Sequence, residues 1–351
     1  MQKKQYSVLV VGTSSPHVAN YLNRIDADDF IITVISNNDA FLKEGTSFFK
    51  VDFSLMKIWN WLITPMKISR VIRTVKPDVI HIHQANAVAF YTVLANKKFK
   101  VPTILTAWGS DILINPQKSW ILKKMVQYVL KRVNRCTADA HFLAQEMINL
   151  VPGYSLKVDI GNFGVPEWPI IDSKEKWFYS NRNHNPLYRI DEVIKGFHRF
   201  LSSTDDKSWK LIIAGRGSET QRLLELVDEF KIGENVEFKG FVDTQTNIEL
   251  YAKAQYFISL PESDATAMSL LESMYFKCIP IVSDLPANQE WIEHGLNGII
   301  VSDLNQNYLT TALSMNASIV GELNHKKILE KGTEKRSKAF FRGVLFKAIE
   351  S

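Results

Sequence analysis

Short runs of apolar residues alternate with longer segments of helical periodicity along most of the chain. In the first 110 residues, four apolar runs have the length and composition of buried strands: 8–11, 31–35, 79–82 and 103–105. Segments long enough for helices, such as 18–25 and 55–75, lie between them. This alternation is typical of βαβ units, so the sequence predicts an α/β fold built on a doubly wound parallel sheet.

The alternation is interrupted by a stretch with glycine and proline at 153–169 and then begins again. Five more strands are expected at 177–180, 211–214, 236–238, 256–259 and 279–282, with helical patterns at 191–201, 219–230, 246–254 and 267–276. A second doubly wound domain is therefore expected. We place the first domain at 1–165, the second at 166–325 and a final segment at 326–351.

The composition excludes several classes of protein. Of the 351 residues, 46% are hydrophobic and 23% are charged, which excludes wholesale disorder. The two cysteines, Cys136 and Cys278, have no CxxC or Cys/His spacing near them, which argues against a disulfide framework and a zinc site. No uncharged apolar stretch approaches the ~20 residues that span a bilayer. We therefore expect a cytoplasmic protein that is soluble or peripheral to a membrane.

Charge is divided unevenly along the chain. Residues 1–150 contain 19 Lys and Arg against 10 Asp and Glu, a net charge of +9. Residues 151–325 contain 15 against 24, a net charge of −9, and residues 326–351 contain 8 against 3, a net charge of +5. The two domains are expected to meet different partners, and the basic last segment is expected to pack on the first domain.

The segment 259–282 carries the most informative chemistry. After a predicted strand, a polar loop contains Asp264, and a helix that begins near Thr266 or Ala267 carries Glu272. A helix N-terminus offers unpaired backbone N–H groups and a partial positive charge that suit a diphosphate, while carboxylates suit ribose and sugar hydroxyls. From spacing alone, the alternative is that Asp264 caps the helix and Glu272 is solvated.

This segment resembles the donor-binding signature of the family 4 retaining glycosyltransferases: an acid, seven intervening residues, a Glu, and then an apolar strand. Asp264, Glu272 and residues 276–282 fill that template. Other segments resemble motifs of the same family in the same order: 79–84, 101–111, 162–165, 211–218 and 288–298. The resemblance therefore covers nearly the whole chain.

The resemblance implies the GT-B fold, in which two Rossmann-like domains face each other across a cleft and a C-terminal helix crosses back to the N-terminal domain. It implies a retaining hexosyltransferase that uses a nucleotide-sugar, with a UDP-sugar favoured over a GDP-sugar. The expected acceptor is a lipid-linked or cell-surface glycan in polysaccharide or glycolipid biosynthesis. Neither a metal nor a cofactor is expected, because cationic side chains can stabilise the leaving diphosphate.

On the donor side, the resemblance assigns Glu272 to the ribose and Asp264 to the donor sugar. It assigns the diphosphate to Arg182, Arg189 and the helix start at Thr266, Ala267 and Met268, and it places Gly215 in a strand-to-helix turn. Two positions depart from the family pattern: Asp264 replaces the usual Glu, and the usual diphosphate Lys falls on Tyr188 or Arg189. For Arg182, the alternative is a surface ion pair.

On the acceptor side, the loops that follow predicted strands carry His17, His83, Trp108 and Asp111. Trp108 stands where many relatives have a His, and an indole can stack on a sugar but cannot act as a base. We expect the other three to converge on the acceptor hydroxyl, with Asp111 also in the catalytic set beside Asp264, Glu272 and Arg182. The alternative is that each His satisfies a local hydrogen bond.

Two segments of the basic half, 55–74 and 119–135, combine aromatic and cationic residues and contain no acid. That composition is typical of helices on anionic membrane surfaces, so peripheral attachment to the inner face of the cytoplasmic membrane is expected. The alternative is that these helices pack on the sheet and expose basic faces to solvent. No nucleic-acid-binding motif is found, and no nucleic-acid partner is expected.

Two other functions remain open from the sequence. A nucleotide-sugar epimerase or hydrolase could use the same fold if further carboxylates faced the cleft. A non-catalytic glycosyltransferase-like partner subunit is suggested by the departures at Asp264, Trp108 and Tyr188. Binding of a nucleotide-sugar, or its turnover without an acceptor, would separate these functions.

Overall fold

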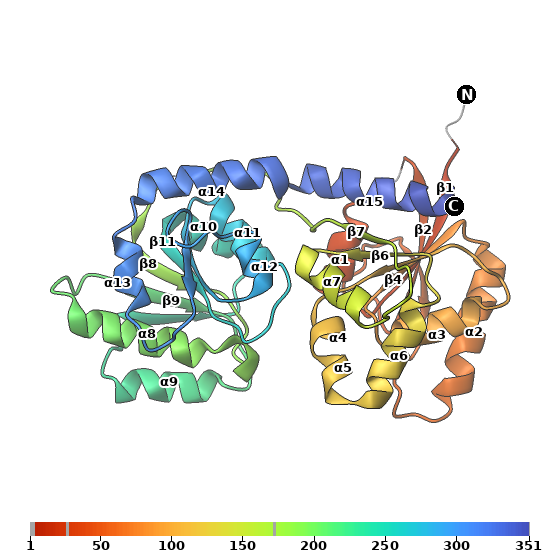
Figure 1. The fold of residues 1–351 in the computed structure, drawn as a ribbon, viewed down its shortest axis with the longest axis horizontal. Helices are drawn as coiled ribbons and strands as arrows, with labels where there is room; N and C mark the ends of the chain where they lie inside the picture. Colours follow the sequence, from red (N-terminus) through yellow and green to blue (C-terminus); the bar gives the residue numbers. More distant parts are fainter. Residues whose placement is uncertain (1–3, 26–27, 171–172, 351) are drawn as a thin grey trace. The chain divides into compact units, whose positions relative to one another are not determined.

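The computed structural model describes residues 4–25, 28–170 and 173–350 of the chain. It divides into two compact units, shown in Figure 1: the first runs to Phe163 and resumes at Glu334, and the second comprises Gly164–Thr333. Each unit is a parallel sheet covered by helices, which confirms the predicted α/β fold.

The sheet of the first unit has seven parallel strands in the order β3-β2-β1-β4-β5-β6-β7. The strands are β1 (Tyr6–Val11), β2 (Phe30–Ser36), β3 (Ser47–Lys50), β4 (Val79–His83), β5 (Thr103–Thr106), β6 (Arg135–Ala138) and β7 (Val158–Ile160). Val8 pairs with Ile32 of β2 on one side and with Val79 of β4 on the other. The direction of chain progression across the sheet reverses between β1 and β4, and such switch points bind ligands in open α/β sheets.

Eight helices of the described residues belong to the first unit. They are α1 (Pro16–Leu22), α2 (Asn60–Val75), α3 (Ala87–Asn96), α4 (Ser110–Leu113), α5 (Asn115–Lys118), α6 (Trp120–Leu130), α7 (His141–Asn149) and α15 (Glu334–Ile349). Helix α3 packs between α2 and α6, with the Phe90 ring 5.8 Å from Trp61 and 5.6 Å from Tyr128.

The sheet of the second unit has six parallel strands in the order β10-β9-β8-β11-β12-β13. They are β8 (Glu175–Ser180), β9 (Lys210–Ala214), β10 (Val236–Gly240), β11 (Ala254–Ser259), β12 (Ile279–Ser283) and β13 (Ile299–Val301). Alternate side chains enter two separate apolar cores: Phe178 and Ile213 point into one, and Tyr179 and Ile212 into the other. Because both faces are buried, the strands read as continuous apolar runs in the sequence.

Helices cover both faces of this second sheet. They are α8 (Ile190–Ser203), α9 (Thr220–Glu229), α10 (Thr244–Lys253), α11 (Met268–Tyr275), α12 (Pro286–Gln289), α13 (Tyr308–Leu313) and α14 (Ala317–Lys331), with a 3₁₀ turn, η1, at Pro186–Tyr188. The N–H of Val165 donates to the carbonyl of Gly332 at 2.7 Å, so the two ends of the second unit are tied together.

The last segment is divided differently from the sequence expectation. The predicted boundary at 325/326 falls inside α14, which belongs to the second unit, and the chain changes unit after Thr333. Helix α15 packs on the first unit, where Phe341 and Leu345 are fully buried and Arg342 pairs with Asp29 at 2.6 Å. The charge boundary at 325 was misleading because the lysines just after it belong to the end of α14, where Lys326 and Lys331 are exposed.

Candidate functional site

Two sets of polar residues lie at the carboxyl ends of the strands, one in each unit. In the second unit, the loops that follow β8 and β11 bring together Arg182 and Asp264. The Arg182 Nη2 atom donates to Asp264 Oδ2 at 2.6 Å, and Nη1 donates to Ser269 Oγ at 2.9 Å. The guanidinium also lies over the Tyr188 ring, 4.4 Å from its centroid. The alternative of a surface ion pair is excluded, because Arg182 is only 9% exposed.

Arg182 keeps its positive charge in this environment. Burial lowers the pKa of the guanidinium, but the Asp264 carboxylate and the Tyr188 side chain raise it by more, so the net pKa is raised. A buried cation fixed by three partners presents its charge without reorganisation to an anion that binds beside it.

Asp264 does not cap α11. Its Oδ1 atom accepts a hydrogen bond from the N–H of Ala265 at 3.1 Å, and the N-cap residue is Ala267, which has no side-chain cap. The helix begins at Met268, so Thr266, Ala267 and Met268 do form its start. The positive end of α11 thus lies beside the Arg182–Asp264 pair without a capping side chain, an arrangement suited to an anion.

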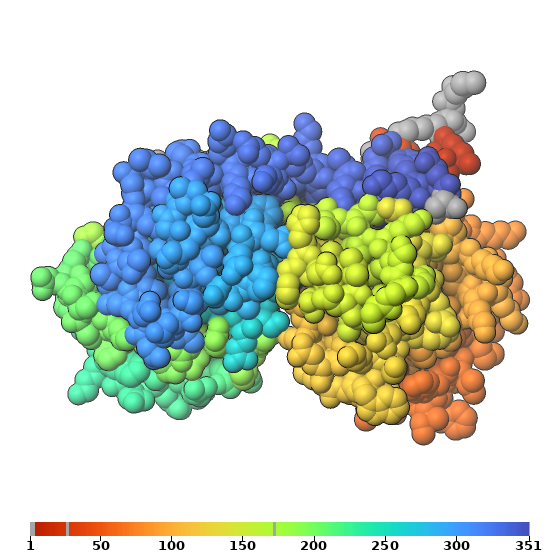
Figure 2. Space-filling model, viewed as in Figure 1, coloured from red at the N-terminus to blue at the C-terminus, as the bar shows by residue number. Residues whose placement is uncertain are grey.

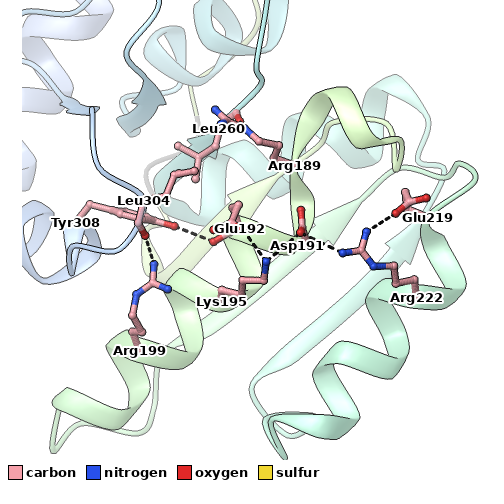
Figure 3. A network of polar contacts seen from close by, with 10 residues as sticks. All are labelled: Arg189, Asp191, Glu192, Lys195, Arg199, Glu219, Arg222, Leu260, Leu304 and Tyr308. Carbon is pink, nitrogen blue, oxygen red and sulfur yellow. Dashed lines mark hydrogen bonds and ion pairs between the residues drawn. The ribbon is translucent and has the colours of Figure 1, made fainter.

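Arg189 lies differently from its predicted place on the diphosphate. Its Nε atom donates to the Leu260 carbonyl at 2.7 Å and Nη2 donates to the Pro261 carbonyl at 3.0 Å. Figure 3 shows the side chain directed at Leu260, beside the polar network of α8. These donors are occupied by backbone, so Arg189 holds the end of β11 in place in this structure and is a positioning residue.

The same network anchors α8, whose N-terminus follows Arg189 directly. Lys195 pairs with Asp191 at 3.1 Å and with Glu192 at 2.6 Å, and Arg222 of α9 lies 3.4 Å from Asp191. Figure 3 shows these side chains spanning the first turns of α8 and α9. The pairs involve partly exposed side chains, and each contributes little to stability. Together they fix the first turns of α8, which Arg189 directly precedes.

Glu272 lies on α11 and belongs to a network that the sequence did not reveal. Tyr251 Oη lies 3.1 Å from Glu272 Oε2, and Asn181 Nδ2 donates to Tyr251 Oη at 2.8 Å and to Asn247 Oδ1 at 3.1 Å. Tyr179 also donates to Asn247, at 2.6 Å. Burial raises the pKa of Glu272 to about 7, against hydrogen bonds from Tyr251 and Asn247 that lower it. Glu272 is therefore not the solvated residue of the alternative interpretation.

Gly215 sits where only glycine fits. Its φ is +125°, its N–H donates to the Gly240 carbonyl at 2.7 Å, and a Cβ would overlap the Arg182 carbonyl oxygen. Gly217 is similarly close to the carbonyl of His184. The turn after β9 is thus packed against the loop that carries Arg182, as the predicted strand-to-helix turn requires.

In the first unit, the start of α1, the end of β4 and the loop after β5 bring together His17, His83 and Trp108. The Trp108 ring centroid lies 4.7 Å from that of His17 and 6.0 Å from that of His83. Tyr21 of α1 lies 4.4 Å from His83 on another side. The three residues lie at the carboxyl ends of neighbouring strands beside the switch point, where ligands bind in such sheets. The expected convergence of His17 and His83 with Asp111 on an acceptor hydroxyl stays a prediction.

His83 is fully buried, and neither ring nitrogen has a hydrogen-bond partner among the described residues. Burial, with a smaller effect from His17, lowers the pKa of His83 to about 3, so the ring is neutral. The buried Nε1 of Trp108 also lacks a partner in the described part of the chain. Unsatisfied buried polar groups are costly, and they gather here at the position where an acceptor is expected.

The neighbouring His81 shows the contrasting arrangement. Its Nε2 atom lies 2.6 Å from Thr106 Oγ1, and its Nδ1 atom bonds the Tyr21 hydroxyl. Both nitrogens are satisfied inside the core. The local-hydrogen-bond alternative therefore describes His81, and it does not describe His83.

Asp111 does not face an acceptor. It is 1% exposed, and its Oδ2 and Oδ1 atoms accept hydrogen bonds from the N–H groups of Ala85 at 2.6 Å and Trp108 at 3.0 Å. Burial raises its pKa in spite of these bonds. In this structure Asp111 joins the loops after β4 and β5 and sets the place of Trp108, and its predicted catalytic role stays a prediction.

Within the described ranges, no cluster of three or more His, Cys, Asp or Glu side chains is arranged to hold a metal ion. The groups that can meet a ligand in the second unit are Arg182, Asp264, Glu272 and the start of α11. Those in the first unit are His17, His83 and Trp108. The groups of the second unit can bind an anion. Those of the first unit can bind a hydroxyl group and stack on a sugar ring.

Comparison with known proteins gives one family model for each unit. Residues 7–140 match the model described as glycosyl transferase 4-like, and residues 167–315 match the model described as glycosyl transferases group 1. The chain is 25% identical over 252 residues to N-acetyl-alpha-D-glucosaminyl L-malate synthase of Bacillus anthracis, covering 67% of this chain and 64% of that protein. The match thus spans less than two thirds of that relative.

A second relative is the GDP-mannose:cellobiosyl-diphosphopolyprenol alpha-mannosyltransferase of Xanthomonas campestris, 29% identical over 101 residues, or 28% of this chain and 27% of that one. Among solved structures, HepE of Anabaena in complex with UDP superposes with a TM-score of 0.80 at 13% identity, over 98% of this chain and 100% of that chain. At that identity the likeness establishes the fold. The chain belongs to the family 4 glycosyltransferases, which have the GT-B fold of two Rossmann-like domains.

Proposed function

We propose that the protein is a retaining glycosyltransferase that moves a sugar from a nucleotide-sugar to a glycan or lipid-linked acceptor. The observation that carries the proposal is the joining of Arg182, Asp264 and Ser269 beside the uncapped start of α11. Two residues 82 positions apart form a fixed cation–carboxylate pair at a helix N-terminus. A nucleoside diphosphate with an attached sugar can use both groups, the cation for its phosphates and the carboxylate for its sugar hydroxyls.

In this proposal, the diphosphate binds Arg182 and the N–H groups at the start of α11, and the sugar hydroxyls bind Asp264. Glu272 accepts hydrogen bonds from the ribose. As the glycosidic bond breaks, negative charge grows on the departing diphosphate, and the fixed guanidinium and helix dipole stabilise it. Because these groups supply the positive charge, we propose that the reaction needs no metal.

Retention is proposed to follow a front-face path. The acceptor hydroxyl attacks from the side that the diphosphate leaves, and the departing phosphate oxygen accepts the acceptor's proton. Burial lowers the pKa of His83 to about 3, which makes it a weak base, and the Asp111 carboxylate is bonded to backbone, so neither is suited to take that proton. We propose instead that His83 and Trp108 bind and orient the acceptor.

The identity of the substrates rests on the relatives. HepE of Anabaena was solved with UDP, and the Xanthomonas campestris enzyme is named for GDP-mannose and a diphosphopolyprenol acceptor. We propose a UDP-sugar as the first choice of donor, GDP-sugar as the second, and a lipid-linked or cell-surface glycan as the acceptor.

The test is calorimetric titration with UDP, UDP-glucose and GDP-mannose. Arg182→Ala should weaken binding at least about tenfold, because a charge-assisted contact to phosphate is lost. Lys176→Ala is the matched control, since Lys176 is an exposed cation of the same unit that pairs with Asp206, and it should leave binding unchanged. Absence of binding by the native protein would contradict the enzyme proposal and favour a non-catalytic partner subunit.

Slow donor hydrolysis tests the stereochemistry. With water as acceptor, proton NMR should first detect the same anomer that the donor carries. The opposite anomer would contradict retention, and rapid turnover without any added acceptor would favour the hydrolase or epimerase alternative.

A further inference from the structure

A group of large apolar side chains is exposed where α2 begins. Ile58, Trp59 and Leu62 are 81%, 76% and 71% exposed, and Met56 and Met66 are exposed as well. The opposite side of α2 buries Ile68, Val71 and Ile72. The helix thus has a second apolar face at its start that packing on the sheet does not explain.

A second exposed group lies at the start of α6, where Trp120 is 73% exposed and Ile121 is 56% exposed. Helices α2 and α6 flank α3. Helix α2 leads into β4 and α6 leads into β6, and each helix runs antiparallel to the strands of the sheet. Both helices therefore begin at the carboxyl edge of the sheet. Figure 1 shows their starting ends on the same edge as α4 and α5, and Figure 2 shows the orange and yellow segments forming the lower margin of this unit. His17, His83 and Trp108 follow strands that end at this edge.

The charge around these side chains is predominantly positive. Residues 53–77 and 112–138 contain no Asp or Glu, and they supply Lys67, Lys118, Lys123 and Lys124 near the two helix starts. One further lysine, Lys57, is paired with Asp52 at 2.7 Å. Neither helix has an acid in its first turn or a side-chain cap, so the positive ends of both dipoles add to the field.

We propose that these side chains, Met56, Ile58, Trp59, Leu62, Met66, Trp120 and Ile121, insert into the headgroup region of an anionic bilayer. We name this surface the apolar edge. Exposed Trp and aliphatic residues surrounded by lysine match the membrane interface, whereas the core of a protein–protein interface is depleted in lysine. Within the described ranges, no helix is long and apolar enough to cross a membrane.

The consequence for catalysis rests on the proposed function. The apolar edge lies on the sheet edge that carries His83 and Trp108, so a bilayer bound there would present a lipid-linked acceptor beside them. Binding to vesicles does not itself depend on the reaction. The two proposals can therefore fail separately.

The experiment is co-sedimentation of the full chain with vesicles of phosphatidylcholine alone or with about a third phosphatidylglycerol. Native protein should bind the anionic vesicles, and raising the salt concentration should weaken the binding. Ile58→Ser combined with Leu62→Ser should reduce the partition coefficient at least about tenfold, because two inserted side chains lose their burial. Ile319→Ser with Leu323→Ser on α14 is the matched control, an exposed pair at the same spacing.

A second measurement separates insertion from loss of fold. Trp59→Phe should remove much of the blue shift in tryptophan fluorescence on vesicles while leaving the melting temperature and UDP binding unchanged. The proposal is overturned if native protein binds UDP but not anionic vesicles, or if the Ile58/Leu62 variant binds vesicles as native protein does. It is also overturned if native protein is a dimer that this variant dissociates, since a second copy would then cover the apolar edge.

Discussion

Glu272 of α11 is held by hydrogen bonds from Tyr251 and Asn247. The spacing to Asp264 and the family resemblance pointed to Glu272, but no sequence pattern indicates these two neighbours. Those two residues lie on α10, and only the fold brings that helix beside α11. Asn181 could have been suspected, because it directly follows a predicted strand.

The raised pKa of Glu272 has a defined effect on stability. A carboxyl whose folded pKa of about 7 exceeds its unfolded value binds its proton more tightly in the folded state, so stability falls as pH rises from about 4.5 to about 7. Glu272→Gln removes the ionisable group. We expect the free energy of unfolding of this variant, relative to that of the native protein, to rise from pH 5 to pH 8 by on the order of 2 kcal/mol.

Thermal unfolding at the two pH values measures this gain, with Glu249→Gln, an exposed residue of α10, as the control. The same variant should lose UDP affinity, because a neutral amide accepts ribose hydroxyls more weakly than a carboxylate. Native protein should bind UDP more tightly as pH rises through 7. If the Glu272 variant and the native protein had equal melting temperatures at pH 8, burial of the charged Glu272 carboxylate would not destabilise the fold.

Arg189 and Asp111 lie in the predicted loops, but their side chains contact the backbone of the scaffold. Arg189 donates to the carbonyls of Leu260 and Pro261, and Asp111 accepts from the N–H groups of Ala85 and Trp108, so their roles towards a ligand stay predictions. Sequence position indicates that a residue lies at the correct edge of a sheet. It does not indicate whether the side chain turns towards a ligand or back into its own scaffold.

At the scale of elements, buried strands were predicted better than edge strands. All nine predicted apolar runs lie inside strands, while β3, β6, β7 and β13 were missed. β3 and β7 are short and half-exposed at their ends of the sheet, so they lack an apolar run. In β6, the buried Thr137 hydroxyl is satisfied by a hydrogen bond with the Thr106 hydroxyl at 2.7 Å. A hydrophobic pattern cannot reveal a buried polar residue of this kind.

The turn between β9 and α9 gives a prediction at this scale. Gly217→Ala should displace the turn from the loop of His184, because the added Cβ would overlap a backbone carbonyl that cannot move alone. We expect a loss of about 1–3 kcal/mol in the free energy of unfolding. UDP binding should weaken too, since Arg182 lies in the displaced loop.

Gly233→Ala is the matched control, because a Cβ at Gly233 meets nothing within 4 Å. Denaturant unfolding and calorimetry of both variants measure the two effects. If Gly217→Ala retained native stability and affinity, the close packing of these loops would not be needed to form the site.

At the scale of the whole molecule, charge follows the structural units more closely than it follows sequence halves. The first unit, with α15 included, contains 25 Lys and Arg against 13 Asp and Glu, and the second contains 17 against 24. The net charges are +12 and −7. The sequence predicted this division and the return of the basic tail, but placed the boundary eight residues early because α14 ends in lysine.

Because the last segment, 334–351, belongs to the first unit, the two units should differ in how well they fold as separate fragments. Residues 164–333 are contiguous, so we expect this fragment to fold alone and to bind UDP as the full chain does. Residues 1–163 should fold weakly, because they lack Phe341, Val344, Leu345 and Ala348, which α15 buries against them. Adding a peptide of residues 334–350 should restore a cooperative thermal transition.

Circular dichroism melting of residues 1–163 with and without the peptide measures this dependence. The control peptide carries Phe341→Ala, which removes ring contacts with Tyr21 and Phe163. Identical melting curves in all three samples would mean that α15 contributes nothing to the core of the first unit.

The position of α15 also sets an order of events during translation. The ribosome makes residues 1–163 first, but the helix that completes their core is made only after the whole second unit. The nascent first unit must therefore wait with the Tyr21 and Phe163 rings uncovered while the later unit folds, a period in which chaperones can act on it. Premature termination shortly before Glu334 would leave the second unit intact and damage the one that was synthesised earlier.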